Sequence, residues 1–203
     1  MNVTWVTASE IHYPERLFPF DPDPPGVLFL YGNVGLLQRA TFTVMASRGG
    51  PSPLLDEIER LAEAGVLAGE VLVGGTGREE YERASVVPLR WGAPRILAFD
   101  QGLFRILGED LKSEAFRAAR LWRYEFDPST DLALSPFRPS DPFIGANNRT
   151  RDRLIAGLSD RLDLPHITLG GNIERCARMA LKAGRKVRTL SPEILSAGAE
   201  PLR

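Results

Sequence analysis

The chain has 203 residues, enough for one sizeable hydrophobic core, and its 43% hydrophobic and 25% charged residues exclude a wholly disordered protein. A single cysteine, Cys176, excludes a disulfide framework and a multi-cysteine zinc site, and the two histidines lie far apart, so we expect neither a metal nor a cofactor. The net charge of −1 excludes a protein that holds nucleic acid mainly through its overall charge.

Hydropathy and the distribution of charge along the chain further restrict the class of protein. No stretch approaches the ~20 consecutive apolar residues that span a bilayer, and the N-terminus lacks the charged and apolar regions of a signal peptide, so we expect a cytoplasmic protein with no membrane contact. Residues 145–190 contain eight Arg and two Lys against four Asp or Glu. Positive charge is therefore concentrated in this part of the chain.

The N-terminal segment is rich in proline. Residues 13–27 hold five of the sixteen prolines, which block helix continuation and central-strand pairing. We predict that residues 1–33 form a proline-rich extension packed on the core. Residues 34–192 are predicted to form one domain, and residues 193–203 a short tail.

From residue 41 onward, strand and helix patterns alternate. Short apolar runs predict strands at 41–47, 70–75, 95–99, 121–126, 166–171 and 186–190. Helical spacing predicts helices at 54–65, 78–85, 111–120, 147–159 and 172–184, with a proline-rich loop at 127–143. Because parallel strands need crossover helices, this order predicts an α/β, Rossmann-like fold with a mainly parallel sheet and helices on both faces. Ligands of such a sheet bind at the carboxyl ends of its strands.

Three of the predicted strand-to-helix junctions, at 47–50, 74–77 and 170–172, are rich in glycine. Glycine lets a phosphate approach the backbone, and the N–H groups of the following helix then point at the anion. Ordinary turn chemistry remains the alternative at each junction, since GGTG lacks the Lys-Ser/Thr of a Walker loop. The junctions contribute these candidate phosphate-binding residues: Gly49, Gly74, Gly75, Gly77, Gly170, Gly171 and Asn172.

Arginines near these junctions supply positive charge. Arg149 and Arg153 are four residues apart and share a helix face, and the helix at 172–184 presents a basic face. Simple surface exposure is favoured for Arg178 and Lys182 on that face. The arginines predicted to contact an anion are Arg48, Arg149, Arg151, Arg153 and Arg175.

Other reactive side chains have structural explanations. Cys176 falls on the apolar face of its helix, which favours a core residue, and His166 has no visible partners for a catalytic triad. Glu79 and Glu80 follow a glycine loop and are candidates for an acid/base pair, although glutamates in a first helical turn also stabilise the helix itself. We favour binding without catalysis.

A stretch of nine residues is similar to a family signature. Residues 151–159, RDRLIAGLS, resemble the RNRIIAGLS signature of the DprA/Smf family, bacterial proteins that protect incoming single-stranded DNA during transformation and load the RecA recombinase. Residues 170–173 resemble the family's SGSL turn, and 184–192 its GR-x-V strand ending in proline. Upstream, 13–17, 24–32 and 44–48 resemble its "YP–L", "PP-x-vLy-x-G" and "vaiVGsR" stretches, in the same order.

This resemblance implies an extended Rossmann-like domain that binds single-stranded DNA. It implies that Arg48, Arg151 and Arg153 line a pocket for the strand's phosphates, helped by the backbone of Gly170 and Gly171. It also implies a homodimer, with RecA as a partner. The chain departs from the family in having Asp152 where an asparagine usually separates the two arginines.

Two other interpretations stay open. GGTG followed by two glutamates is similar to the "PGG-x-GT-x-x-E" motif of the related LOG (lysine-decarboxylase-like) proteins, which cleave or sense nucleotide phosphoribosyl groups. As such an enzyme, the chain would need Glu80 within reach of a ribose and Arg78 on its phosphate. Alternatively, the chain is a scaffold that binds a protein partner through its proline-rich segment.

Overall fold

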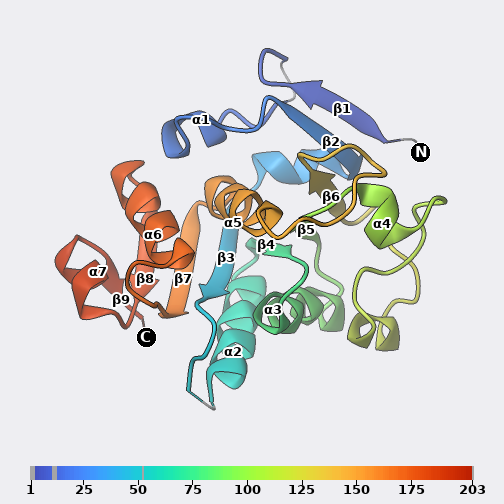
Figure 1. Ribbon diagram of the computed structural model, residues 1–203. Coiled ribbons are helices and arrows are strands. Elements are labelled where there is room, and N and C mark those ends of the chain that lie inside the picture. Colours follow the sequence, from blue (N-terminus) through green and yellow to red (C-terminus); the bar gives the residue numbers. More distant parts are fainter. Residues whose placement is uncertain (1–2, 11–12, 52, 203) are drawn as a thin grey trace.

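The computed structural model describes residues 3–10, 13–51 and 53–202, and these form one nine-stranded sheet covered by helices (Figure 1). The strands are β1 (Thr4–Thr7), β2 (Val27–Gly32), β3 (Thr41–Ala46), β4 (Val71–Gly75), β5 (Arg95–Ala98), β6 (Leu132–Ser135), β7 (Arg161–His166), β8 (Lys186–Thr189) and β9 (Glu200–Pro201). The α-helices are α1 (Leu17–Phe20), α2 (Leu54–Leu67), α3 (Glu79–Arg90), α4 (Leu103–Leu107), α5 (Asn147–Leu158), α6 (Asn172–Lys182) and α7 (Pro192–Ser196), and the 3₁₀ helices are η1 (Val34–Gln38) and η2 (Ala118–Leu121).

The sheet has the order β1-β2-β6-β5-β4-β3-β7-β8-β9. All pairs from β6 through β9 are parallel, whereas β1–β2 and β2–β6 are antiparallel. From β3 the chain first builds outward through β4, β5 and β6, then returns to place β7 on the other side of β3. The strand order therefore reverses between β3 and β7, which is where open α/β sheets bind ligands.

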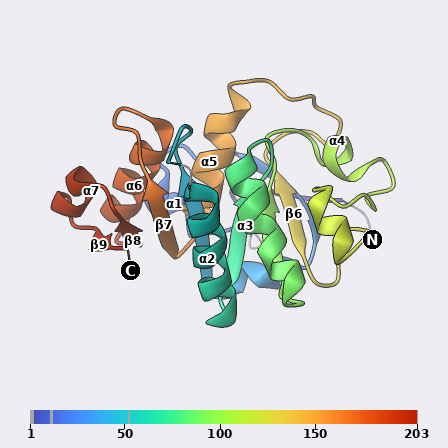
Figure 2. The ribbon, with the colours of Figure 1, turned by 90° about the horizontal axis from the view of Figure 1, so that it is seen from below.

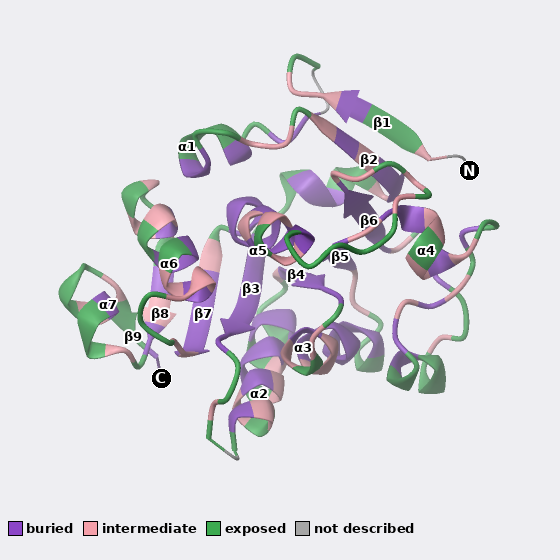
Figure 3. Cartoon of the chain, in the orientation of Figure 1, coloured by how far each residue is buried: buried purple, intermediate pink, exposed green. Residues whose placement is uncertain are grey.

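Helices cover both faces, as predicted. Figures 1 and 2 show α2 and α3 against one face and α5 and α6 against the other. The alternation of side chains along a strand explains this arrangement: on β5, Ile96 and Ala98 pack in the core beneath α5 and α6, while Leu97 packs with α3 and α4 residues on the opposite side. The central strands are buried throughout and the outer helix faces are exposed (Figure 3).

The N-terminal and C-terminal segments contribute regular elements to the sheet and its covering helices. The predicted extension contributes β1 and β2 to the sheet, and the predicted tail contains most of α7 and all of β9. Strand β2 pairs with β6, whose sequence lies inside the predicted loop at 127–143. The proposed division at residues 33 and 192 stays a prediction.

The middle of the chain also differs from the prediction. Residues 111–120 do not form the predicted helix and 121–126 do not form a strand; instead η2 and turns cover α3. The cause is tertiary: Arg95 on β5 is fully buried and donates hydrogen bonds to Glu114 at 2.7 Å and to Asp131 at 2.9 Å. These ion pairs hold the segment against the sheet in place of helical hydrogen bonds.

Strand β7 covers 161–166 and not the predicted 166–171. Its charged residues argue against a buried strand, but Asp163 is paired with Arg188 on β8 at 2.5 Å. The register between β3 and β7 shifts where Leu164 and Pro165 of β7 lie opposite Met45 alone, and Pro165 has no N–H to donate to the sheet. No helix in the described part of the chain is long and apolar enough to cross a membrane.

Candidate functional site

The loops after β3 and β7 meet where the strand order reverses. The amide of Ser47 donates to the His166 carbonyl at 2.9 Å, and the amide of Thr168 donates to the Ser47 hydroxyl at 2.8 Å. Helix α5 lies above this junction and α6 begins beside it (Figure 1). Together they enclose a hollow of about 360 Å³, the switch-point pocket, which is lined by Ser47, Arg48, Arg78, Asn148, Arg149, Arg151, Asp152, Thr168, Gly171, Asn172 and Ile173.

Arg151 lies at the floor of this pocket and is fully engaged by the protein. Its side chain is 0% exposed and donates to Asp100 at 2.5 Å, to Asp152 at 2.9 Å and to the carbonyl of Thr76 at 2.6 Å. The guanidinium also lies over the ring of Tyr81. Nearby carboxylates and a carbonyl occupy the donors of Arg151, which argues against the predicted contact with a ligand phosphate; that contact stays a prediction.

Gly74 and Gly75 are also buried and serve packing. A Cβ at Gly74 would lie 2.0 Å from the Ser85 hydroxyl of α3, and one at Gly75 would lie 2.7 Å from Ile155 of α5. These glycines let helices approach β4 closely from both faces, and their predicted phosphate contact stays a prediction. Gly77 is exposed, but it lines a separate hollow beside Glu79 and Arg117.

Asp152 completes a hydrogen-bond network beneath the pocket. One carboxylate oxygen accepts from the Tyr81 hydroxyl at 2.7 Å and from Arg151, and the other accepts from the Asn172 amide at 2.8 Å. Burial, followed by the nearby Asp152 charge, raises the pKa of Tyr81 well above its usual value, so the phenol stays a donor. The carboxylate of Asp152, which stands where the DprA/Smf signature has an asparagine, is thus paired with the guanidinium of Arg151.

The exposed positive charge of the site comes from Arg48, Arg149 and Arg175. None of the three forms an ion pair with a described residue, in contrast to Arg78, which pairs with Glu80, and Arg153, which pairs with Asp21. Arg48 and Arg149 line the switch-point pocket. Their guanidinium groups are available to an external anion.

The N-terminus of α6 adds backbone donors. The first N–H groups of a helix have no intrahelical partner and carry the positive end of its dipole. Gly170 adopts a positive φ of +75° in the turn before the helix, a conformation that residues with a side chain rarely take. The turn brings Gly171 and Asn172 to the border of the pocket. The amides of Gly170 and Gly171 already donate to Glu174 and to the Thr168 carbonyl, and their predicted phosphate contact stays a prediction.

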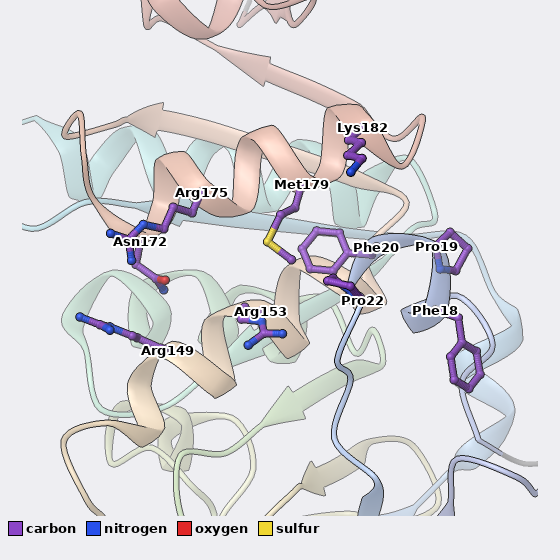
Figure 4. A pocket seen from close by; sticks show the side chains of 10 residues that line it. All are labelled: Phe18, Pro19, Phe20, Pro22, Arg149, Arg153, Asn172, Arg175, Met179 and Lys182. Carbon is purple, nitrogen blue, oxygen red and sulfur yellow. The ribbon is translucent and has the colours of Figure 1, made fainter.

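A second hollow of about 540 Å³ adjoins the switch-point pocket, and Figure 4 shows its side chains. We call it the α1 groove because α1 and the residues after it form one wall; its lining consists of Phe18, Pro19, Phe20, Pro22, Arg149, Arg153, Asn172, Arg175, Met179 and Lys182. Arg153 lines this groove, whereas Arg48 lines the switch-point pocket, and the predicted contact of both with one strand stays a prediction. The prediction overlooked Phe18 and Met179, and it assigned Lys182 to plain surface.

Of the two glutamates considered as an acid/base pair, Glu79 is exposed, whereas Glu80 is engaged within the protein. Arg78 pairs with Glu80 at 3.0 Å and also donates to the carbonyl of Ala46 at 2.7 Å, and both side chains are largely buried. Cys176 is fully buried, and burial raises the pKa of its thiol, which makes it a poor nucleophile, as its helix position predicts.

Comparison with solved structures identifies the fold. No family model and no curated protein sequence matches the chain. The structure of DNA processing protein A (DprA) from Streptococcus pneumoniae matches with a TM-score of 0.79 and 20% identity, covering 100% of this chain and 71% of that one. The fold is that of DprA.

Two further structures are similar. The DNA processing protein A of Helicobacter pylori, whose single-stranded DNA binding mode was studied, matches with a TM-score of 0.73 and 20% identity over 98% of this chain and 90% of that one. A Moco carrier protein from Chlamydomonas reinhardtii matches with a TM-score of 0.50 and 19% identity over 80% of this chain and 87% of that one.

Proposed function

We propose that this protein binds single-stranded DNA through its phosphates at the switch-point pocket, without strong sequence preference and without catalysis. The observation that carries the proposal is the position of Arg48 and Arg149, exposed and without an ion pair to any described residue, beside the N-terminus of α6. Phosphate oxygens accept from guanidinium groups and from helix N-terminal amides alike. The buried Arg151 network holds these elements in place.

Two lines of similarity support this choice of ligand. The residue pattern resembles the DprA/Smf family, and the fold is that of a protein from Helicobacter pylori described as binding single-stranded DNA. From the same resemblance we propose a cytoplasmic homodimer with RecA as a partner. Light scattering tests the dimer, and retention of the protein on immobilised RecA tests the partner.

Fluorescence anisotropy with labelled oligo-dT across a salt series tests DNA binding. We expect salt-sensitive binding that weakens in Arg48→Ala and in Arg149→Ala, each with a salt slope shallower by about 0.7, the value for one lost phosphate contact on a single strand. Lys112→Ala, which removes an exposed charge outside both hollows, is the matched control. Absence of binding by the wild type at low salt would contradict the proposal.

Nucleotide cleavage is the competing function, and the same assay separates it. A nucleoside monophosphate should compete only weakly with oligo-dT, because it offers one phosphate where the strand offers several. Strong competition, or conversion of the monophosphate detected by chromatography, would move the protein to the nucleotide-processing class. The internal Arg78–Glu80 pair argues against that outcome.

A further inference from the structure

The α1 groove continues directly from the switch-point pocket. Arg149 and Asn172 line both hollows, so a DNA strand bound in one hollow can extend into the other along shared residues. In Figure 4 these two side chains lie together with Arg175 at one end of the groove, and Lys182 lies at the other. The groove therefore has the form of a path and not of an isolated cavity.

One face of α6 supplies the charge along this path. Asn172, Arg175, Met179 and Lys182 follow at intervals of three, four and three residues, which places them on one side of the helix over a rise of about 15 Å. Arg175 and Lys182 are exposed and form no ion pair within the described chain. Two cations spaced along a helix match the repeated phosphates of an extended strand.

The opposite wall offers an apolar surface. In Figure 4, Phe20 on α1 faces Met179 of α6 across the groove, and Phe18, which is 47% exposed, lies at the end of the α1 wall beyond Pro19. Aromatic rings beside cations are the usual platform on which unpaired bases stack, and stacking tolerates any base. The groove thus combines a surface for bases with positive charge for phosphates.

The wall that carries Phe18 is firmly attached. Arg16 donates to the Thr41 hydroxyl at 2.7 Å and to the carbonyl of Leu37 at 2.8 Å. Beneath it, Phe20 is buried against Gly157 of α5, where a Cβ would lie 2.9 Å from the ring. An attached wall presents Phe18 without a large ordering cost when a ligand binds.

The groove lining contains no carboxylate. Asp21 lies behind it, is largely buried and neutralises Arg153, so Arg153 orders the wall more than it attracts a ligand. The remaining charge comes from Arg149, Arg175 and Lys182. This surplus favours a polyanion over an uncharged ligand.

We infer that the α1 groove is a second subsite for the same DNA strand, in which a base stacks on Phe18 while Arg175 and Lys182 bind the adjoining phosphates. This inference rests on the proposed function, since the strand reaches the groove from the switch-point pocket. A short oligonucleotide occupies only the pocket, and a longer one occupies both. Dependence on oligonucleotide length is therefore the property to measure.

The experiment compares anisotropy binding of oligo-dT of about 4 and about 15 nucleotides. Phe18→Ala should weaken binding of the longer strand at least about fivefold and leave the shorter one unchanged, whereas Phe18→Trp should retain affinity because it keeps a stacking ring. Lys182→Ala should make the salt slope shallower by about 0.7 for the longer strand only. The exposed residues Tyr124 and Lys112, outside both hollows, provide the controls Tyr124→Ala and Lys112→Ala.

The outcomes separate the two proposals. Failure of the wild type to bind either length would overturn both. Binding that is lost in Arg48→Ala at both lengths, but is the same in Phe18→Ala and Lys182→Ala as in the controls, would leave the proposed function standing and overturn the second subsite. A polyglutamate peptide that displaces the longer strand, with an affinity that Phe18→Ala weakens equally, would also overturn the second subsite. The groove would then bind an acidic polypeptide as well as it binds DNA.

Discussion

Arg151→Ala should destabilise the fold rather than remove a single ligand contact. The side chain is completely buried and pairs with Asp100 and Asp152, whose side chains are 2% and 6% exposed. Its loss leaves two carboxylates in the interior without their cation, and it also removes the donor to the Thr76 carbonyl. Because both carboxylates are buried, the cost falls on the free energy of unfolding.

The size of this effect follows from the burial. Breaking a buried ion pair by removing one partner costs about 3–5 kcal/mol. That is a large share of the roughly 5–15 kcal/mol that stabilises a typical domain. For a chain of this length, each kcal/mol corresponds to about 2–4 °C, so we expect Tm to fall by about 6–20 °C.

Urea and thermal unfolding, both followed by circular dichroism, measure the free energy of unfolding and Tm, with Arg48→Ala as the matched arginine at the surface of the same site. Arg48→Ala should keep the wild-type Tm and lose DNA affinity. Arg151→Lys should lie between wild type and Arg151→Ala, because it keeps the charge but not the forked donors. A Tm for Arg151→Ala within about 2 °C of wild type, together with lost binding, would refute the assignment of Arg151 to the structural network.

Three smaller perturbations test other parts of the structure. Asp152→Asn should raise affinity for oligo-dT at low salt by about fivefold. The reason is that a negative charge ~8 Å from a phosphate, at an effective dielectric constant of about 40, repels the phosphate by about 1 kcal/mol. Unchanged or weaker binding with an unchanged Tm would count against this expectation. Cys176 should resist iodoacetamide until the protein is unfolded, as mass spectrometry would reveal, and rapid labelling of the native protein would contradict its burial. The hydroxyls of Ser129 and Thr130 lower the pKa of Asp127 to about 2. The carboxylate therefore stabilises the fold above the unfolded pKa near 4 and loses this effect as pH falls through 2, so the Tm difference between wild type and Asp127→Ala should shrink over that interval.

The sequence predicted correctly those helices and strands that are specified by their own apolar pattern. Helices α2, α5 and α6 repeat apolar residues at helical spacing, and β3 and β4 are short apolar runs, so their positions follow from local sequence. Residues 111–120 carry an equally helical pattern and form no such helix. There Glu114 is drawn into the core by Arg95, which is distant in sequence, and no local pattern reveals that pairing.

The candidate site was predictable in its location but not in the roles of its arginines. Parallel strands place the loops at 47–50 and 170–172 at one edge, so their proximity follows from the predicted topology. Arg151 and Arg153 stand two residues apart on α5 and reach opposite surroundings, one the interior and the other the α1 groove. Which one is buried depends on Asp100 and Asp21, whose positions only the folded chain determines.

The return of the chain to β3 has a consequence for synthesis on the ribosome. Strand β3 is complete by Ala46, yet one of its two neighbours, β7, begins at Arg161. Until more than a hundred further residues have been translated, the future centre of the sheet has an open edge, the arrangement that promotes pairing with other chains. Nascent chains stalled before β7 should therefore depend on chaperones, whereas chains released after β8 should fold without them.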